Sequence, residues 1–248
     1  MTNAEKYRFA DFTREEYRKI LQKAKAMGYQ FRFFTDFDKD EKFALWRHDL
    51  DFSVHSAKKM AEIEAEEGVR STYFLHLHSE FYNLLEAEVA KLVKDIIGMG
   101  HQVGLHFDTH FYNIQDEESL DEKIIFEKFI LEKFFDTEIK AFSFHNTTPF
   151  TMNCKAATYG GLVNTYANYF QENVTYCSDS NGYWRFKRII DVIEENNPRI
   201  QILTHEWWQA EVMSPKQRVY RWIDGRAEKT KNYYNNSLIK ANRENIDW

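Results

Sequence analysis

The sequence is poor in cysteine, proline and glycine. Its 248 residues include two Cys (Cys154 and Cys177), three Pro and nine Gly. Two cysteines are too few for a disulfide-held scaffold or for a zinc site built from thiolates. The scarcity of proline and glycine also leaves no linker that would mark a domain boundary. We therefore expect a single domain over residues 1–248, with a C-terminal helix from about residue 214, where Ser214-Pro215 is a helix-start signal.

Long apolar runs and an excess of basic charge are absent as well. No stretch approaches the ~18 consecutive apolar residues that a membrane-spanning helix requires. The first residues show neither the basic start nor the apolar segment of a secretory signal, which predicts a cytoplasmic protein. The 33 basic residues are outnumbered by 39 acidic ones, for a formal charge of −6, so nucleic-acid binding is not expected.

Apolar residues make up 43% of the chain and aromatic residues 17%, enough to bury a sizeable core. Helix-like and strand-like segments alternate along the sequence. The expected strands cover residues 43–47, 71–75, 101–105, 140–144, 174–176 and 200–203. The expected helices cover residues 13–27, 53–67, 84–97, 119–135, 189–195 and the segment from 214. This alternation predicts a parallel α/β sheet, and it leaves open whether the sheet is a barrel or flat.

Acidic residues and histidines follow almost every expected strand. In chain order they are Asp49, Asp51, His76, His78, His106, His110, His145, Asp179 and His205. The carboxyl ends of parallel strands lie on one face of the sheet. We therefore expect these side chains to converge on a single site.

Four of these residues have the spacing of a metal site. His106 and His110 are four residues apart, which allows two imidazoles to bind one ion. Asp49 and Asp51 flank one residue of a strand and point the same way, so they repel each other unless a cation or a proton intervenes. A divalent ion held by one aspartate and two histidines would relieve the repulsion and leave positions for water and substrate. In the alternative interpretation, the aspartates only cap the next helix and the histidines are unrelated.

The remaining polar and aromatic residues suggest catalytic roles around such an ion. Asp49 is placed to act as the general base, and His205, at another strand end, as the general acid on the opposite side of the substrate. Trp207 and Trp208 follow closely, and Trp184 is a further candidate for a wall of rings, which suit the C–H faces of a sugar. Core packing is the alternative for each ring.

At these residues the sequence resembles the polysaccharide deacetylase family, also called the NodB-homology or carbohydrate esterase 4 group. The resemblance runs from about Leu45 to Trp208. The family's acidic motif is matched by Arg47-His48-Asp49-Leu50-Asp51. Its Gly-His-x-x-Gly-x-His motif is matched by Gly100-His101-Gln102-Val103-Gly104-Leu105-His106, followed by His110. The sequence departs from the family pattern at the third and fourth motifs, and in this it resembles a divergent branch of the family associated with surface-polysaccharide biosynthesis.

Two further motifs complete the resemblance and imply roles for the site residues. Leu203-Thr204-His205 matches the closing Leu-x-His motif, and Tyr176-Cys177-Ser178-Asp179-Ser180 resembles the fourth motif. The resemblance implies an irregular seven-stranded (β/α) barrel of the NodB type. It also implies a catalytic base, an acid with its orienting aspartate, and three metal ligands, which are respectively Asp49, His205 with Asp179, and Asp51, His106 and His110.

The third motif departs from the family pattern. It normally supplies an arginine that orients the base, and here Phe144-His145-Asn146 stands in its place. Arg47 is the residue that could substitute. The tryptophan that usually follows the aspartate of the fourth motif is also absent, with Trp184 nearby. The residues expected to contact the substrate are Arg47, His78, His145, Trp184, Trp207 and Trp208.

The predicted function is metal-dependent removal of an N-acyl group, most simply N-acetyl, from an amino sugar or from a nucleotide-linked or lipid-linked glycan precursor. Zn²⁺ is the expected ion, although the ligand types also accept Co²⁺, Ni²⁺, Mn²⁺ or Fe²⁺. Two alternatives stay open: a catalytically silent sugar-binding or scaffold protein, and an amidohydrolase acting on a formylated sugar, a ureide or a cyclic imide. A glycoside hydrolase is disfavoured because Asp49 and Asp51 would lie on the same side of the sugar.

Overall fold

The structure is a computed structural model that describes residues 1–246, so the last two residues of the expected domain lie outside the described residues. Its elements in chain order are α1 (Asn3–Lys6), the 3-10 helix η1 (Phe9–Phe12), α2 (Arg14–Ala26), β1 (Gln30–Arg32), β2 (Phe43–Leu50), α3 (Val54–Glu66), β3 (Thr72–Leu75), α4 (Ala87–Gly98), β4 (Gln102–Phe107), α5 (Thr109–Tyr112), α6 (Glu117–Phe135), β5 (Ala141–Phe144), α7 (Pro149–Asn153), β6 (Thr158–Tyr159), β7 (Leu162–Asn164), α8 (Asn168–Asn173), β8 (Thr175–Ser178), α9 (Ile189–Glu194), β9 (Arg199–Thr204) and α10 (Pro215–Lys240).

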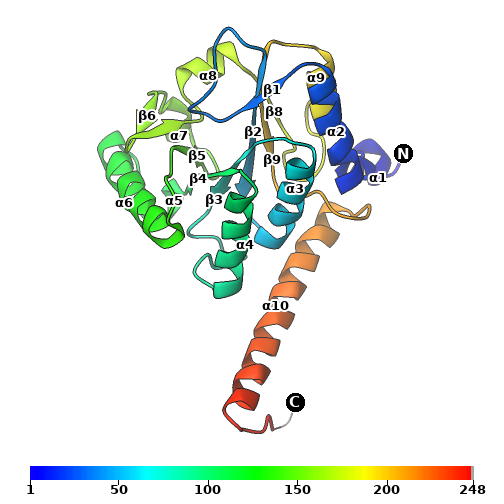
Figure 1. Ribbon diagram of the computed structural model, residues 1–248, viewed down its shortest axis with the longest axis vertical. Coiled ribbons are helices and arrows are strands. Elements are labelled where there is room, and N and C mark those ends of the chain that lie inside the picture. The colour runs from blue at the N-terminus through cyan, green and yellow to red at the C-terminus, as the bar shows by residue number, and fades with distance from the viewer. Residues whose placement is uncertain (247–248) are drawn as a thin grey trace.

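A curled sheet forms the centre of the molecule, with helices around its outer side (Figure 1). Seven strands pair side by side in parallel, in the order β7-β5-β4-β3-β2-β9-β8. Within residues 1–246 no pairing joins the β7 side to β8, so the sheet is a half-barrel that stays open on one side. The expected α/β fold with an irregular seven-stranded barrel is confirmed.

Two short strands extend this framework. β1 pairs in parallel with residues 43–45 of β2, and β6 pairs antiparallel with β7. Gly160 and Gly161, with φ angles of 56° and 74°, make the tight turn between β6 and β7. The sequence did not predict either strand, because three and two residues are too few to show a hydrophobic alternation.

Strand β2 shows how the sheet separates its core from its site. All eight of its residues are buried. Trp46 packs in the outer core with α2, whereas Leu45 lies in the inner core with Phe74. Because side chains alternate along a strand, Arg47 and Asp49 point to the same inner side as Leu45. The inner core therefore ends in charged groups at the carboxyl end of β2.

Gly104 of β4 lies at a close approach between neighbouring strands. A Cβ atom there would stand 2.5 Å from the Phe74 ring and 2.9 Å from the Ala141 carbonyl oxygen. Both distances are below normal van der Waals contact, and the second involves backbone that cannot move aside easily. The glycine of the histidine motif thus lets β4 pack tightly, and it sets the position of His106 two residues later.

Most helix starts follow the capping signals in the sequence. Thr13 caps α2 and Ser53 caps α3, each by accepting a backbone N–H in the first turn. The expected start of α6 at Ser119 is wrong, because the helix begins at Glu117. Asp116 is its cap and accepts hydrogen bonds from both the backbone N–H and the hydroxyl of Ser119, which places that serine inside the helix.

Helix α10 projects away from the half-barrel (Figure 1). It starts after Ser214, whose hydroxyl accepts from the Gln217 N–H, as predicted for the C-terminal helix. Among its residues, Arg218 and Trp222 are buried against the body. A search of the helices in residues 1–246 finds none with the length and apolarity to cross a membrane.

Candidate metal centre and active site

A polar pocket of about 460 Å³ opens at the carboxyl ends of the central strands. The side chains that line it come from far apart in the sequence, and they are Asp49, Asp51, His106, His110, Phe144, His145, Asn146, Thr147, Tyr166, Leu203 and His205. A larger cavity of about 590 Å³ lies between α3 and α10 and is lined mainly by cationic and aromatic residues. The group of carboxylates and histidines makes the polar pocket the candidate site, at the face where parallel α/β barrels place their sites.

Asp49 is held in place by two neighbours. Its Oδ2 lies 3.1 Å from Arg47 Nη2, and its Oδ1 accepts the Ser143 hydroxyl at 3.1 Å. The Ser143 oxygen lies 2.7 Å from His106 Nδ1. Since the hydroxyl proton points to Asp49, the serine oxygen accepts the Nδ1–H of His106, and a neutral His106 ring then carries its lone pair on Nε2. Asp49 and His106 are therefore coupled through one serine.

Arg47 lies completely buried behind Asp49. Its Nη1 donates to Thr165 Oγ1 at 2.6 Å and its Nη2 to the Tyr166 hydroxyl at 3.1 Å. Burial alone would lower the pKa of Arg47, but the Asp49 carboxylate together with Tyr166 and Tyr176 outweighs this effect and raises that pKa. Arg47 therefore lies where it can orient Asp49, and its substitution for the third-motif arginine stays a prediction. We also expected Arg47 to contact the substrate; it is buried under Asp49 and does not line the pocket, and that contact stays a prediction.

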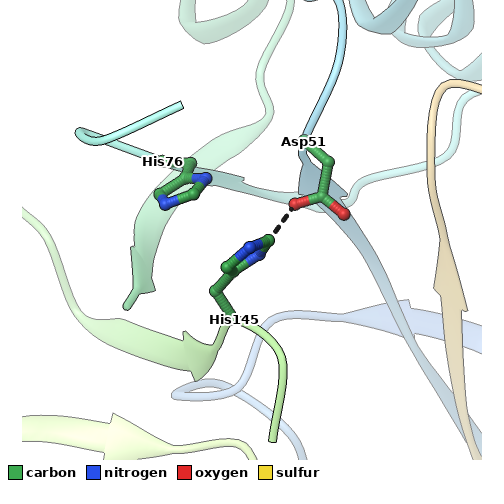
Figure 2. A group of neighbouring side chains, drawn as sticks. All are labelled: Asp51, His76 and His145. Atoms are coloured by element: carbon green, nitrogen blue, oxygen red, sulfur yellow. Dashed lines mark ion pairs between the residues drawn. The ribbon is translucent and has the colours of Figure 1, made fainter. Parts of the chain in front are cut away.

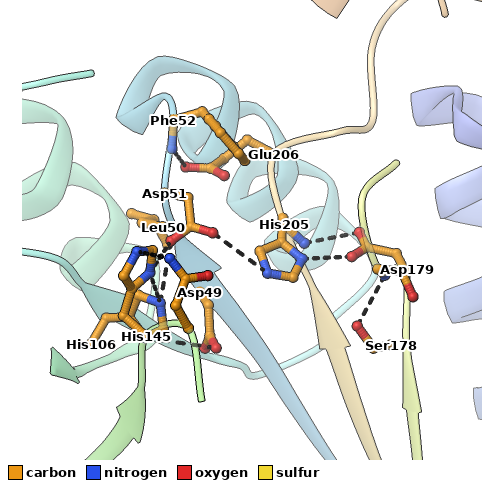
Figure 3. Close-up of polar contacts among 12 residues, drawn as sticks. Asp49, Leu50, Asp51, Phe52, His106, His145, Ser178, Asp179, His205 and Glu206 are labelled. Atoms are coloured by element: carbon orange, nitrogen blue, oxygen red, sulfur yellow. Dashed lines mark hydrogen bonds and ion pairs between the residues drawn. The ribbon is translucent and has the colours of Figure 1, made fainter. Parts of the chain in front are cut away.

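Asp51 faces two imidazoles at the spacing of metal ligands (Figure 3). Its Oδ1 lies 3.2 Å from His106 Nε2 and 3.1 Å from His145 Nδ1, and the two nitrogens are 3.2 Å apart. Donor atoms bound tetrahedrally at ~2.0–2.1 Å from a zinc ion lie ~3.3 Å apart. The three atoms therefore fit a divalent ion, and Asp51 Oδ1 is buried without a hydrogen-bond partner within residues 1–246. Burial would raise the pKa of Asp51, but the imidazoles of His106 and His145 outweigh it and hold that pKa well below its usual range.

His76 approaches the same carboxylate from the end of β3 (Figure 2). One nitrogen of His76 lies within 4.8 Å of ligand atoms of both Asp51 and His145. Its Nε2 is buried and lacks a hydrogen-bond partner in the described part of the chain. Burial, reinforced by repulsion from His106, lowers the pKa of His76 to about 2, so the ring is neutral, as a metal ligand must be. We expected this histidine at the common site from its place at a strand end, but we predicted no ligand role for it.

His110 and His78, both expected at the site, have partners elsewhere. His110 lines the pocket, but its exposed ring places Nε2 2.9 Å from the Asn146 carbonyl oxygen, and no contact with Asp51 is found within residues 1–246. His78 Nε2 lies 2.7 Å from Glu127 Oε1, and the ring stacks on Phe111 at 3.5 Å between centroids. His78 does not line the pocket. The ligand role of His110 and the substrate role of His78 stay predictions.

His205 and Asp179 form a pair across the pocket from the imidazoles (Figure 3). His205 Nδ1 lies 2.7 Å from Asp179 Oδ1, and the His205 backbone N–H donates to Oδ2 at 2.9 Å. Burial alone would lower the pKa of His205, but Asp179 outweighs it and raises that pKa to about 10. The ring therefore carries a proton at neutral pH. Its Nε2 faces the site, 3.7 Å from Asp51 Oδ2.

The three tryptophans expected at a substrate wall are buried, and their contact with substrate stays a prediction. Trp208 is completely buried and donates its Nε1–H to Asp179 Oδ2 at 3.0 Å. Trp207 packs against Trp222, and Trp184 packs against Phe12. None of the three lines the pocket. Burial of such large rings is favourable, and Trp208 is linked to the site through its hydrogen bond to Asp179.

Glu206 supports the segment after Asp51 and was not singled out from the sequence. It is 1% exposed, and its Oε1 accepts the backbone N–H groups of Phe52 and Ser53 at 3.0 and 2.9 Å. Burial, with repulsion from Asp51, raises the pKa of Glu206 to about 8. The residue therefore ties the end of β9 to the end of β2. Its position directly after His205 was the one available signal.

The arrangement has the parts of a metal-assisted acid–base site. Asp49 is an acceptor for a proton, and the protonated His205 is a donor on the other side of Asp51. Asp51 and the neighbouring imidazoles can hold a divalent ion between them. This combination can activate a water molecule, polarise a carbonyl group and protonate a leaving group.

Comparisons with known proteins find matches among solved structures. No family model and no curated protein matches the chain. Solved structures that match include a CE4 family pseudoenzyme from Bacillus anthracis (12% identity over 77% of this chain and 63% of that chain, TM-score 0.43). They also include the catalytic domain of a peptidoglycan N-acetylglucosamine deacetylase from Eubacterium rectale (14%, 79% and 89%, TM-score 0.47) and a chitin deacetylase from Colletotrichum lindemuthianum (13%, 75% and 83%, TM-score 0.41). The chain thus spans less than two thirds of the length of the pseudoenzyme.

Proposed function

We propose that the protein is a metal-dependent hydrolase that removes an N-acyl group from an amino sugar or a glycan precursor. N-acetyl is the acyl group that we favour. One observation carries this proposal. A buried, arginine-held carboxylate (Asp49) and a protonated histidine (His205) share a pocket with Asp51 and its imidazole neighbours. An amide hydrolase needs a proton acceptor for the attacking water and a proton donor for the amine that leaves.

Each residue has a role in the proposed reaction. When bound, a divalent ion, in the first place Zn²⁺, supplies Lewis-acid chemistry that makes water more acidic and an acyl carbonyl more electrophilic. Asp49, held in place by Arg47, takes the proton of the attacking water. His205 gives its Nε2 proton to the amine nitrogen as the C–N bond breaks. Asp179 holds the His205 ring through Nδ1 and stabilises its charged form.

The pocket favours a polar substrate with one apolar face. Its lining combines charged groups with two rings, Phe144 and Tyr166, and the ring centroids of these two lie 5.7 Å apart. A sugar offers C–H faces to rings and hydroxyl groups to polar atoms. We therefore propose acylated amino sugars, free or linked to a nucleotide or lipid carrier, as the substrate class.

The proposal is tested by measuring acid release from a panel of acylated amino sugars. The protein is loaded with Zn²⁺ or Co²⁺, and acetate and formate are assayed in parallel. We expect acetate release that chelation abolishes and that D49N, which keeps the shape of the side chain, lowers by ~10²–10⁴-fold. Formate release without acetate release would move the substrate to formylated sugars. No release from any sugar by metal-loaded protein would favour a catalytically silent binding protein.

A further inference from the structure

We propose that His145, from the end of β5, is the second imidazole ligand of the ion, together with Asp51 and His106, and that His110 is not a ligand. The inference rests on the proposed function in one respect, that a divalent ion resides in this pocket. It assigns to the third-motif position a role that neither the motif resemblance nor our sequence analysis gave it. The motif resemblance places His110 there instead.

The spacing of donor atoms is the first argument. Asp51 Oδ1, His106 Nε2 and His145 Nδ1 form a nearly equilateral triangle with sides of 3.2, 3.1 and 3.2 Å. The His106 and His145 rings stand almost perpendicular, at 87°, with centroids 5.0 Å apart. Two rings so placed aim one nitrogen each at a common point without stacking, which is the arrangement that a shared ion requires.

The overlap between two possible ligand groups is the second argument. Asp51 and His145 form a close triangle with His106, and they also form a wider group with His76, whose ligand atoms lie within 4.8 Å of one another. Figure 2 shows His76 and His145 on the same side of Asp51. Asp51 and His145 are common to both groups. His145 is therefore in the ligand set whichever of the two other histidines completes it.

The support of each ring is the third argument. Ligand histidines usually hold their second ring nitrogen in a hydrogen bond that fixes the tautomer. His106 does so with Ser143, and His145 Nε2 lies 2.8 Å from Nδ2 of the Asn146 side chain, which donates to the ring as placed. That amide can turn its oxygen toward the ring, accept the Nε2–H and leave the lone pair of Nδ1 for the ion.

The position of His110 is explained by the turn that presents His145. Asn146 has a φ of 46°, in the left-handed region, so the chain turns sharply directly after His145. This turn brings the Asn146 carbonyl oxygen to within 2.9 Å of His110 Nε2. His110 thus contacts the backbone of the loop that carries the ligand. Its proposed role is to hold that loop rather than the ion.

Metal affinity of matched histidine variants tests the proposal. The Kd for Zn²⁺ of the full chain and of H145A, H106A and H110A is measured by competition with a chromophoric chelator, and Co²⁺ absorption spectra report the ligand set. We expect H145A and H106A to weaken binding by more than ~100-fold, the upper range for outer-shell partners, and H110A by less than ~10-fold. The Co²⁺ spectrum should change in H145A and keep its shape in H110A.

The outcomes separate this inference from the proposed function. If H110A loses the ion and H145A keeps it, the inference is overturned while the proposed function stands. If the full chain binds neither Zn²⁺ nor Co²⁺, both fall. Urea unfolding of the metal-free variants shows whether H145A is folded, and H145Q, which keeps a polar side chain of similar length, is measured beside it. Loss of binding by both folded variants supports the inference, and retention by folded H145Q with loss by unfolded H145A contradicts it.

Discussion

The substitution R47M tests how much the buried ion pair between Arg47 and Asp49 stabilises the protein. Arg47 is 0% exposed and Asp49 is 2% exposed, so the substitution leaves a carboxylate in the protein interior with the Ser143 hydroxyl as its remaining hydrogen-bond partner. At the observed 3.1 Å separation, Coulomb's law with an effective dielectric constant of ~20 gives about 5 kcal/mol. Removal of one partner from a buried ion pair costs ~3–5 kcal/mol in other proteins. We therefore expect R47M to lower the free energy of unfolding by about 3–5 kcal/mol.

Urea denaturation of the metal-free protein, followed by tryptophan fluorescence, provides the measurement. A double-mutant cycle with D49N isolates the pair, because R47M/D49N leaves no unpaired charge and should recover most of the stability lost in R47M. R32M is the matched control. Arg32 pairs with Glu41 at 2.8 Å but on the surface, with 28% and 41% of the side chains exposed, so its loss should cost less than ~1 kcal/mol. A cost for R47M as small as that of R32M would refute the reasoning.

Three further predictions concern the acid, the base and the buried carboxylate of α3. D49N should bind Zn²⁺ with a Kd within ~10-fold of the wild-type value, whereas its kcat should fall by at least ~10²-fold. An unchanged kcat would show that Asp49 is not the general base. D179N should lower kcat by at least ~10² and shift the pH–rate profile, because His205 loses the partner that holds its ring and its charge; an unchanged profile would contradict this role. Burial alone would raise the pKa of Glu64, but His48 outweighs it and lowers that pKa to about 2. Because this pKa lies below that of the unfolded chain, charged Glu64 stabilises the folded protein above pH ~4.5, and about 3 kcal/mol of the stabilisation is lost as the pH falls toward 2. The free energy of unfolding in urea should therefore depend less on pH for E64Q than for the wild type. Identical slopes would exclude Glu64 as the cause of the acid destabilisation.

The fold could be predicted from the sequence because its signals are local and repeated. Helix starts are indicated by residues whose side chains can cap the first turn, which are Thr13, Ser53 and Ser214. Short apolar runs indicate the strands. The convergence of the polar strand ends followed from the parallel arrangement alone. We predicted the start of α6 at the wrong residue because Asp116 and Ser119 can both act as N-caps. The sequence does not show which of them caps the helix; in the structure it is Asp116.

The residue types of the site could be predicted from the sequence, but which of these side chains lie next to each other could be predicted less well. Asp49, Asp51, His106 and His205 share the pocket as expected. The position of His145 beside Asp51 depends on the loop geometry at Asn146, which no periodicity encodes.

Arg47 can replace the arginine missing from the third motif only if its side chain points to the inner side of the sheet. The alternation of β2 implies that direction once the inner face of the strand is known. The burial of Trp207 and Trp208 could not be foreseen, because a ring beside a catalytic residue suits a core and a cleft equally well.

The most direct test of the account is an anomalous-scattering map at the zinc edge from crystals of the protein grown with Zn²⁺. The account predicts a single strong peak in the polar pocket, at ~2.0–2.2 Å from a carboxylate oxygen of Asp51 and from the ring nitrogens of His106 and His145. A map with no zinc peak within ligand distance of Asp51 would contradict the claim that this pocket is a metal-dependent hydrolase site.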